Sequence, residues 1–376
     1  MEKIICLIIC YVLLRIYHAT RTKAYLKRTD GLPYEIEIVA ENLNIPWAMD
    51  ISEQNALYFT QRPGTVRVIK NGQLIQEPLI TFSSPFVSEG EGGLLGLALD
   101  PDFISNRYIY VLYTYKENNQ YYNRVVRLHE YNNRATIDKV ILDKIPASLN
   151  HNGGRIKIGP DKKLYITVGD ADQPELAQDI NSLAGKILRI ELDGSIPQDN
   201  PIPNSPVYSL GHRNPQGITW DQNNNMYITE HGPIAHDEIN KIQPGGNYGW
   251  PLVAGKQEAS LIQTIKPLLD SGDETFAPSG ITFINEGPLQ GRLLVATLRG
   301  KQLLSILPDE EGVEVLEIDS FLNNEFGRLR DVILASDGSI YIATSNRDGR
   351  GIPDRTDDKI IRLVPVNNLS LDQTSL

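Results

Sequence analysis

The sequence predicts an all-β protein, a six-bladed β-propeller. A turn followed by a strand-like run recurs six times along the chain, and each copy precedes a second short run of β-branched and aromatic residues. Such alternation between Asn, Asp and Gly turns is typical of strands. Long amphipathic helical patterns are almost absent. A small sheet cannot bury both faces alone, so repeats of this kind stack radially. A β-sandwich is the alternative, and it explains the sixfold repetition less well.

Each repeat contributes two predicted strands. The first strands, with their turns, are expected at 55–60, 106–111, 161–167, 224–229, 291–297 and 337–344. The second strands are expected at 66–69, 125–128, 187–190, 238–242, 303–306 and 360–363. An early strand at 34–39 is expected to join the last blade and close the ring. The predicted propeller therefore covers residues 31–366, followed by a polar tail at 367–376.

Residues 1–30 form a signal peptide or an N-terminal membrane anchor in this prediction. Lys3 precedes an apolar run at residues 4–14, and basic residues follow from Arg15 to Arg28. A run of about eleven apolar residues fits a signal-peptide core, whereas a full span needs about twenty. Export to the periplasm or the extracellular space is therefore expected. No small-x-small cleavage site follows, so an uncleaved anchor at the membrane surface is one alternative. A hydrophobic start to a cytoplasmic protein is the other.

The composition excludes several classes of function. Among 376 residues, 41% are hydrophobic and 22% charged, which is ordinary for a soluble globular protein. The net charge of −11 argues against a nucleic-acid partner. Both cysteines, Cys6 and Cys10, lie in the N-terminal segment. The predicted propeller therefore contains no disulfide, thiolate metal site or cysteine nucleophile.

His151 is the candidate base. Loops from every blade of a propeller converge over one end of its central channel, and loops commonly carry function. His151 lies in a glycine-rich insert, 150–155, just before the third repeat. An imidazole that titrates near neutral pH can take a proton from a hydroxyl group. The alternative is a loop histidine that only hydrogen-bonds to a neighbouring carbonyl.

Arginines recur in glycine-bearing loops of three different repeats. They are Arg213, which is followed by Asn214, and Arg299, Arg328 and Arg330. Arginine pairs bidentately with carboxylates and keeps its charge. In a propeller these side chains would converge on one polyanionic ligand, although each alone is also typical of a solvated or salt-bridged surface.

An acidic turn is the metal candidate. Asp237 and Glu238 offer hard oxygen ligands, and the Gly232–Pro233 turn offers backbone carbonyls, a set that suits calcium. Zinc on His231 and His236 is the rival, but no third nitrogen or sulfur ligand follows at typical spacing. A solvated acidic turn is the remaining alternative.

Three further acidic residues lie in glycine-bearing turns. Glu91, within 88–96, is a candidate for lining the site. The glycines around it do not form a phosphate-binding P-loop, because no Lys-Ser/Thr pair and no helix follow. Asp170 and Asp172 could line the site, but we interpret them as turn residues.

These motifs, in this order, resemble the soluble quinoprotein sugar dehydrogenases, also described as the glucose/sorbosone dehydrogenase or aldose sugar dehydrogenase family. The resemblance extends from about Leu43 to Val364. The motifs that carry it are 90–96, 150–155, 211–217, 231–233 with 237–238, and 328–331. The family resemblance implies a six-bladed propeller that holds pyrroloquinoline quinone (PQQ) and calcium.

The resemblance also implies roles for individual residues. His151 looks like the base that takes the proton of the sugar's anomeric hydroxyl while hydride passes to the quinone. Arg213 looks like the residue that polarises the quinone oxygen. The implied cofactor contacts are Glu91, Asn214, Arg299, Arg328 and Arg330, with the arginines meeting the cofactor's carboxylates.

The implied calcium ligands form two sets. The carbonyl oxygens of Gly232 and Pro233 resemble the ligands of a calcium ion that bridges to the cofactor. Glu238 and the carbonyl of Tyr248 resemble a second, structural calcium site.

Two positions depart from the family pattern. Some members have glutamine at the position of Glu91. Arg299 stands where the best-known relatives have lysine, which keeps the charge but changes the donor geometry. The short loops between blades resemble the broad-specificity aldose branch of the family.

The expected activity is PQQ- and calcium-dependent oxidation of an aldose to a lactone, with electrons passed to an external acceptor that the sequence does not identify. One alternative is a calcium-dependent propeller lactonase, which would hold its metal over the channel with side-chain carboxylates. The other is a non-catalytic binding propeller, in which His151 and the arginines would be dispensable.

Overall fold

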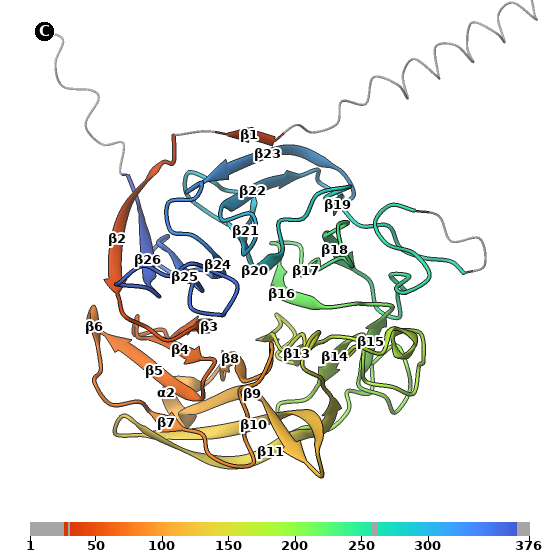
Figure 1. Cartoon of the computed structure of the whole chain (residues 1–376), viewed down its shortest axis with the longest axis horizontal. Coiled ribbons are helices and arrows are strands. Elements are labelled where there is room, and N and C mark those ends of the chain that lie inside the picture. Colours follow the sequence, from red (N-terminus) through yellow and green to blue (C-terminus); the bar gives the residue numbers. More distant parts are fainter. Residues whose placement is uncertain (1–25, 29–30, 258–261, 367–376) are drawn as a thin grey trace, which may run out of the picture.

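Six sheets stand as blades in a ring in the part of the chain that the structure describes (Figure 1). The structure is a computed structural model that describes residues 26–28, 31–257 and 262–366. Helical structure in this part is limited to α2 (Phe103–Asn106) and a 3-10 turn at Pro174–Ala177. The predicted six-bladed β-propeller is therefore confirmed.

The strands of the first five blades follow one another in the sequence. Blade one contains β3 (Pro46–Ile51), β4 (Leu57–Gln61), β5 (Thr65–Lys70) and β6 (Gln73–Leu74), with β7 (Ile80–Thr81) also paired to β5. Blade two contains β8 (Leu94–Leu99), β9 (Tyr108–Glu117), β10 (Gln120–Tyr131) and β11 (Arg134–Pro146). Blade three contains β12 (Ile156–Ile158), β13 (Leu164–Val168), β14 (Lys186–Ile190) and β15 (Val207–Leu210).

The second half of the ring repeats this order. Blade four contains β16 (Pro215–Trp220), β17 (Met226–Glu230), β18 (Glu238–Ile242) and β19 (Leu269–Asp270). Blade five contains β20 (Pro278–Phe283), β21 (Leu293–Thr297), β22 (Leu303–Pro308) and β23 (Val315–Phe321). Blade six contains β24 (Leu329–Leu334), β25 (Ile340–Thr344), β26 (Ile360–Pro365) and β2 (Tyr34–Ala40).

The predicted strands are the second and third strands of the blades. The six recurring phrases coincide with β4, β9, β13, β17, β21 and β25. The second runs coincide with β5, β10, β14, β18, β22 and β26. Neighbouring strands within a blade are antiparallel, so the segment before each first strand and the segment after each second strand lie at the same end of the ring. This arrangement gathers the loops that carry the site.

Strands from the early part and from the late part of the described chain together form the last blade. β2 pairs antiparallel with β26, which confirms that the early strand closes the ring. A short strand, β1 (Leu26–Arg28), pairs in parallel with β23. The predicted apolar run at 4–14 and the polar tail at 367–376 lie outside the described residues. Across 26–28, 31–257 and 262–366, no helix has the length and apolar character needed to cross a membrane.

The hydrophobic cores lie between neighbouring blades, whereas polar side chains meet near the axis. The largest core joins apolar residues of blades one, two and three. Near the centre, Arg155 forms a buried ion pair with Asp331 of β24 at 3.0 Å and lies over the ring of Trp47 at 4.3 Å. Asp331 also accepts a hydrogen bond from the backbone N–H of Met49 at 2.8 Å. These contacts tie blades one, three and six together beneath the site.

Candidate active site

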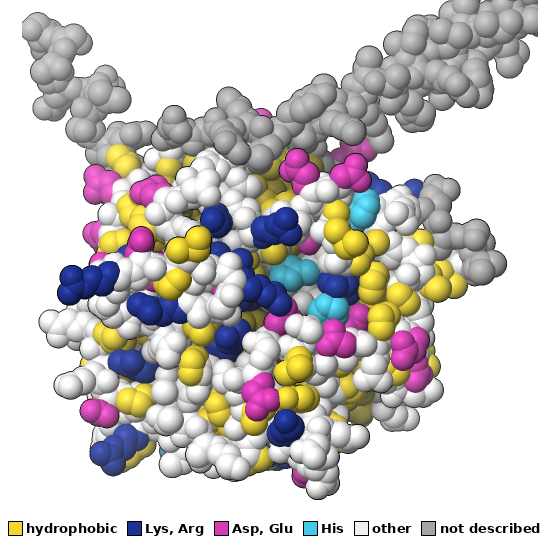
Figure 2. Space-filling model, in the orientation of Figure 1, with side chains coloured by type: hydrophobic (Ala, Val, Ile, Leu, Met, Phe, Trp, Pro, Cys, Tyr) yellow, Lys and Arg dark blue, Asp and Glu magenta, His cyan; other side chains and the backbone are white. Residues whose placement is uncertain are grey.

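Two adjoining cavities occupy the loop-bearing end of the ring. The outer cavity has a volume of about 530 Å³ and the inner one about 250 Å³. Basic and histidine side chains gather in the central hollow of this face (Figure 2). The residues that line both cavities are Glu91, Asn150, His231, Leu298 and Arg350. The site is therefore built from loops of several blades.

Most of the predicted site residues meet here. The outer cavity is lined by Glu91, His151, Arg213, Asn214, Gly232, Pro233, Arg299 and Arg328. The inner cavity is lined by Arg330 and again by Glu91. Glu238 and Tyr248 lie apart, around a small neighbouring void.

The imidazole of His151 lies between an acidic residue, Asp170, and a basic residue, Arg213. Its Nδ1 atom lies 2.8 Å from Oδ1 of Asp170, and its Nε2 atom lies 2.9 Å from Nη2 of Arg213. A guanidinium only donates hydrogen bonds, so Nε2 is the acceptor and the ring proton resides on Nδ1. This arrangement assigns the neutral tautomer whose Nε2 lone pair can accept a proton.

Asp170 orients the histidine, besides shaping the turn that we expected. The residue is fully buried, and its Oδ1 accepts the backbone N–H of Asp172 at 3.0 Å. Its second oxygen accepts a hydrogen bond from Nε1 of Trp250 at 2.8 Å. With both oxygens engaged, the carboxylate fixes the ring of His151. The sequence offered only its turn composition and did not reveal this role.

The backbone of this loop is packed too tightly for another residue at position 169. A Cβ atom on Gly169 would lie 1.9 Å from the carbonyl oxygen of His151. The next residue, Asp170, donates its backbone N–H to the carbonyl of Arg213 at 2.8 Å. The end of β13 therefore sets the positions of His151 and Arg213 together.

Arg213 reaches from the insert before β16 toward the Gly232 turn. Its Nη1 donates to the carbonyl of Gly232 at 2.7 Å, and its backbone N–H donates to Glu230. Its Nε is buried and has no hydrogen-bond partner among the described residues. Burial lowers the pKa of Arg213, while the charges of Asp170 and Glu230 oppose the shift. The guanidinium stays protonated and has a donor to spare.

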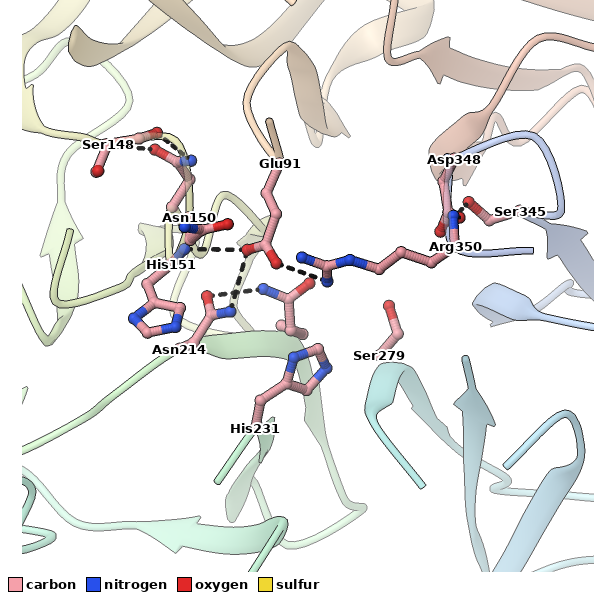
Figure 3. Close-up of polar contacts among 12 residues, drawn as sticks. Glu91, Ser148, Asn150, His151, Asn214, His231, Ser279, Ser345, Asp348 and Arg350 are labelled. Carbon is pink, nitrogen blue, oxygen red and sulfur yellow. Dashed lines mark hydrogen bonds and ion pairs between the residues drawn. The ribbon is translucent and has the colours of Figure 1, made fainter. Parts of the chain in front are cut away.

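Glu91 connects blade two to the loops of blades three, four and six (Figure 3). Its Oε2 accepts the backbone N–H of His151 at 3.0 Å and Nδ2 of Asn214 at 3.5 Å. Its Oε1 forms an ion pair with Arg350 at 2.8 Å. Burial raises the pKa of Glu91, but Arg350 and the His151 N–H outweigh it and hold the pKa below its usual value. Glu91 is therefore an anion at neutral pH.

Arg328 and Arg330 flank one carboxylate. Nε and Nη2 of Arg328 donate to Oδ2 of Asp348 at 3.1 and 2.8 Å. Arg330 lies 3.7 Å from the same oxygen and donates to Oε1 of Gln216 at 3.2 Å. Burial lowers the pKa of Arg330 to about 9, while Asp348 opposes the shift. Arg330 therefore keeps its charge at neutral pH.

Arg299 differs from the other arginines. Its side chain is exposed and lines the outer cavity. Within the described parts of the chain, no hydrogen bond or ion pair engages its guanidinium. This side chain is therefore free to turn toward a ligand.

The two cavities carry more positive than negative charge. Their charged lining residues are Arg62, Arg213, Arg299, Arg328, Arg330 and Arg350 against Glu91, Asp237 and Asp348. Burial lowers the pKa of His231 to about 4, although Asp237 and Glu91 oppose the shift, so this imidazole is neutral. The excess of three positive charges favours a ligand with several carboxylates.

The predicted metal turn is held by Asp237. One carboxylate oxygen accepts the backbone N–H of Gly232 at 3.0 Å. The other accepts three donors at 2.8 Å each, from Thr275, Phe276 and Ala277. Asp237 therefore clamps this turn to the segment before β20. The described residues contain no group of three or more His, Cys, Asp or Glu side chains arranged to hold a metal.

The zinc alternative requires His231 and His236 to bind one ion, but the structure does not bring them to a common partner. Nε2 of His231 lies 2.9 Å from the carbonyl of Pro278, whereas Nδ1 of His236 lies 3.0 Å from Oδ1 of Asp270. The two imidazoles thus have different partners.

The protonation state of the Glu238 carboxyl would change if a cation bound beside it. Burial raises its pKa to about 8, and the neighbouring Glu230 adds to the shift. Its oxygens accept hydrogen bonds from the Gly255 N–H at 2.7 Å and from Asn240 at 2.9 Å. A buried carboxyl of this kind is protonated at neutral pH unless a cation ionises it.

Fold and site together define a propeller protein with an arginine-lined cavity beside an oriented histidine. Residues 43–361 match the family described as glucose/sorbosone dehydrogenase. Because this match covers most of the chain, the protein belongs to that family.

Two curated relatives and one solved structure illustrate the likeness. The chain is 34% identical over 309 residues to quinoprotein glucose dehydrogenase B of Acinetobacter calcoaceticus, covering 71% of this chain and 64% of that protein. It is 30% identical over 339 residues to aldose sugar dehydrogenase YliI of Escherichia coli K12, covering 84% and 91%. The PQQ-bound aldose sugar dehydrogenase of Streptomyces coelicolor is 35% identical, with a TM-score of 0.80 and coverages of 91% and 99%.

Proposed function

We propose that this protein is a PQQ-dependent aldose sugar dehydrogenase. It oxidises the anomeric hydroxyl of an aldose to the lactone and passes the electrons to an external acceptor. One observation carries the proposal: His151, oriented by Asp170 and contacted by Arg213, lies in the wall of an arginine-lined cavity. The named relatives support the same chemistry.

The residues of the cavity fit PQQ, a planar quinone with three carboxylates. The outer cavity has a volume of about 530 Å³, within the range of about 300–1,000 Å³ that is typical of small-molecule sites. The buried Nε atoms of Arg213 and Arg330 have no partner among the described residues. The residues that would hold the cofactor are Arg213, Asn214, Arg299, Arg328 and Arg330, with Glu91 beside them. When bound, PQQ supplies the hydride acceptor.

The protein's own residues supply the proton chemistry. Nε2 of His151 takes the proton of the anomeric hydroxyl as the C1 hydride leaves. Asp170 keeps the ring in the required tautomer and stabilises the imidazolium that forms. Arg213 directs positive charge to the oxygen on which negative charge develops. In the present arrangement Arg213 donates to Nε2, so this hydrogen bond must be released before the base can act.

Calcium belongs to the same proposal. The carbonyls of Gly232 and Pro233 at the wall of the outer cavity would hold one calcium ion beside the cofactor, since calcium prefers oxygen ligands. A cation there would repel Arg213 from the Gly232 carbonyl and free its N–H for the cofactor. Glu238 and the Tyr248 carbonyl would hold a second, structural ion.

The proposed location is outside the cytoplasm, in the periplasm or the medium. Export through residues 1–30 is one part of this proposal, and retention at the membrane through residues 4–14 is its alternative. Sequencing the N-terminus of the mature protein distinguishes a cleaved signal peptide from an anchor.

An assay of dye reduction tests the activity. Protein incubated with PQQ and calcium should reduce an artificial electron acceptor when an aldose is added. Lactone hydrolysis without dye reduction would favour the lactonase instead, but that function gives no reason for arginines from several blades. The absence of both activities would favour the binding propeller.

A further inference from the structure

The inner cavity contains an arginine that sequence analysis did not identify. Arg62 follows β4, at the loop-bearing end of blade one. Its Nη2 approaches the carbonyl of Asp348 at 3.5 Å, and its Nε is buried without a partner among the described residues. Burial lowers the pKa of Arg62, while Asp348 and Glu91 oppose the shift. The side chain remains a cation in the wall of the inner cavity.

Arg330 faces the same cavity from blade six. It is only 8% exposed, and its Nε also has no partner in the described parts of the chain. Buried polar groups in proteins are normally hydrogen-bonded, so an unpartnered donor needs an explanation. The Nε atom of Arg67, away from both cavities, is also buried without a partner among the described residues. The observation that points to an anionic oxygen is therefore that Arg62 and Arg330 are two cations lining one cavity.

The other charges of the inner cavity are already paired. Glu91 pairs with Arg350 at 2.8 Å, and Asp348 pairs with Arg328 at 2.8 Å. Asp348 also lies 3.7 Å from Arg330. Four arginines, Arg62, Arg328, Arg330 and Arg350, face two carboxylates here, so two positive charges remain uncompensated. Because Glu91 is neutralised by Arg350, a second carboxylate can approach without meeting a bare negative charge.

We propose that the inner cavity receives one carboxylate of the bound cofactor, and that Arg62 and Arg330 hold it there. This inference rests on the proposed function and adds Arg62 to the residues that bind the cofactor. A volume of about 250 Å³ accommodates a carboxylate with bound water, and a water occupies about 30 Å³ in the liquid. The cavity adjoins the outer one, as their shared lining residues require.

Trp47 provides a signal for the test. Its ring lines the inner cavity and lies 5.6 Å from the guanidinium carbon of Arg330. A quinone bound nearby should quench its fluorescence. The dissociation constant of PQQ can therefore be measured by fluorescence titration with calcium present and no sugar added, independently of turnover.

The variants are Arg62→Gln and Arg62→Lys, with Arg67→Gln as the matched control. Arg67 lies on β5 of the same blade and contacts Gln61 and the carbonyls of Ile75 and Gln76, away from both cavities. Arg62→Gln should weaken PQQ binding about tenfold, equal to about 1.4 kcal/mol. Arg62→Lys keeps the charge and should fall between this variant and the wild type. Arg67→Gln should bind as the wild type does.

Inorganic phosphate separates the two sources of an anion. If the cofactor's carboxylate occupies the cavity, phosphate should compete with PQQ in the wild type and compete less in Arg62→Gln. Phosphate that leaves PQQ affinity unchanged or increases it would show that the two anions do not share the cavity and would overturn the proposal. Equal PQQ affinity in Arg62→Gln and the wild type would also overturn it. A wild type that binds no PQQ would instead contradict the proposed function.

Discussion

The buried carboxylate of Asp170 lies 2.8 Å from Nδ1 of His151. Its other oxygen is held by Trp250, so the carboxylate cannot turn away from the imidazole. This pairing leaves Nε2 of His151 as the basic atom in the wall of the outer cavity. It is the geometry that makes one histidine of this chain suitable for proton abstraction.

Replacing Asp170 by asparagine should lower kcat by about a hundredfold, because general-base catalysis depends on the tautomer and on the stabilised imidazolium. The PQQ dissociation constant should change little, since Asp170 is not expected to contact the cofactor. Steady-state kinetics and a fluorescence titration separate the two effects. Weaker PQQ binding with unchanged turnover of the loaded protein would contradict the orienting role.

Replacing His151 by alanine should abolish aldose-dependent dye reduction and leave cofactor uptake largely intact. The reason is that the variant loses the base but keeps the arginines that line the two cavities. Dye reduction is assayed after saturation with PQQ. Retained turnover would exclude His151 as the base.

Replacing Arg328 by alanine should weaken PQQ retention more than it slows the reaction of the bound cofactor. The reason is that Arg328 contacts a carboxylate of PQQ in the proposed site. Retention is measured as the PQQ that remains after gel filtration. Arg292→Ala is the control, since Arg292 pairs with Asp319 and Glu317, away from both cavities. Equal retention in the two variants would remove Arg328 from the cofactor site.

Replacing Glu91 by glutamine should lower the thermal midpoint of unfolding most strongly near neutral pH. Burial raises the pKa of Glu91 in the fold, but Arg350 and the His151 N–H outweigh this effect and lower the pKa below its usual value. A carboxylate whose pKa is lower in the folded state than in the unfolded state stabilises the fold at pH values above its unfolded pKa. This contribution disappears as the pH falls through the folded pKa. The midpoints of the wild type and the variant should therefore converge in acid.

A control for this pH series is Glu37→Gln. Glu37 is an exposed residue of β2 that pairs with Arg362 at 3.3 Å, and exposed pairs contribute little to stability. A difference between the wild type and Glu91→Gln that stays constant across the pH range would contradict the ionised state of Glu91.

The fold was predictable because the second and third strands of each blade alternate clearly between turn residues. The first strands were not, because polar and glycine residues interrupt their apolar runs. β16, for example, contains Gln216 and Gly217 within a mostly buried strand. Such a strand is stable because the neighbouring blades of the ring pack against it.

The candidate site was predictable where a loop motif resembled the family. Arg62 and Arg350 were missed, and Asp170 was interpreted as a turn residue only, because each lies in a turn whose composition is common to many surfaces. Their shared position offers a signal, since all three follow the second strand of a blade, as Arg299 does. The partners of Asp170 could not be predicted, because Trp250 reaches it from 80 positions away in the sequence.

The most direct test is the absorption spectrum of the purified protein with PQQ and calcium, recorded before and after an aldose is added. We predict a bound-quinone band that converts to the reduced form on addition of the sugar. A protein that binds no PQQ, or whose bound quinone is unchanged by any aldose, would contradict the central claim.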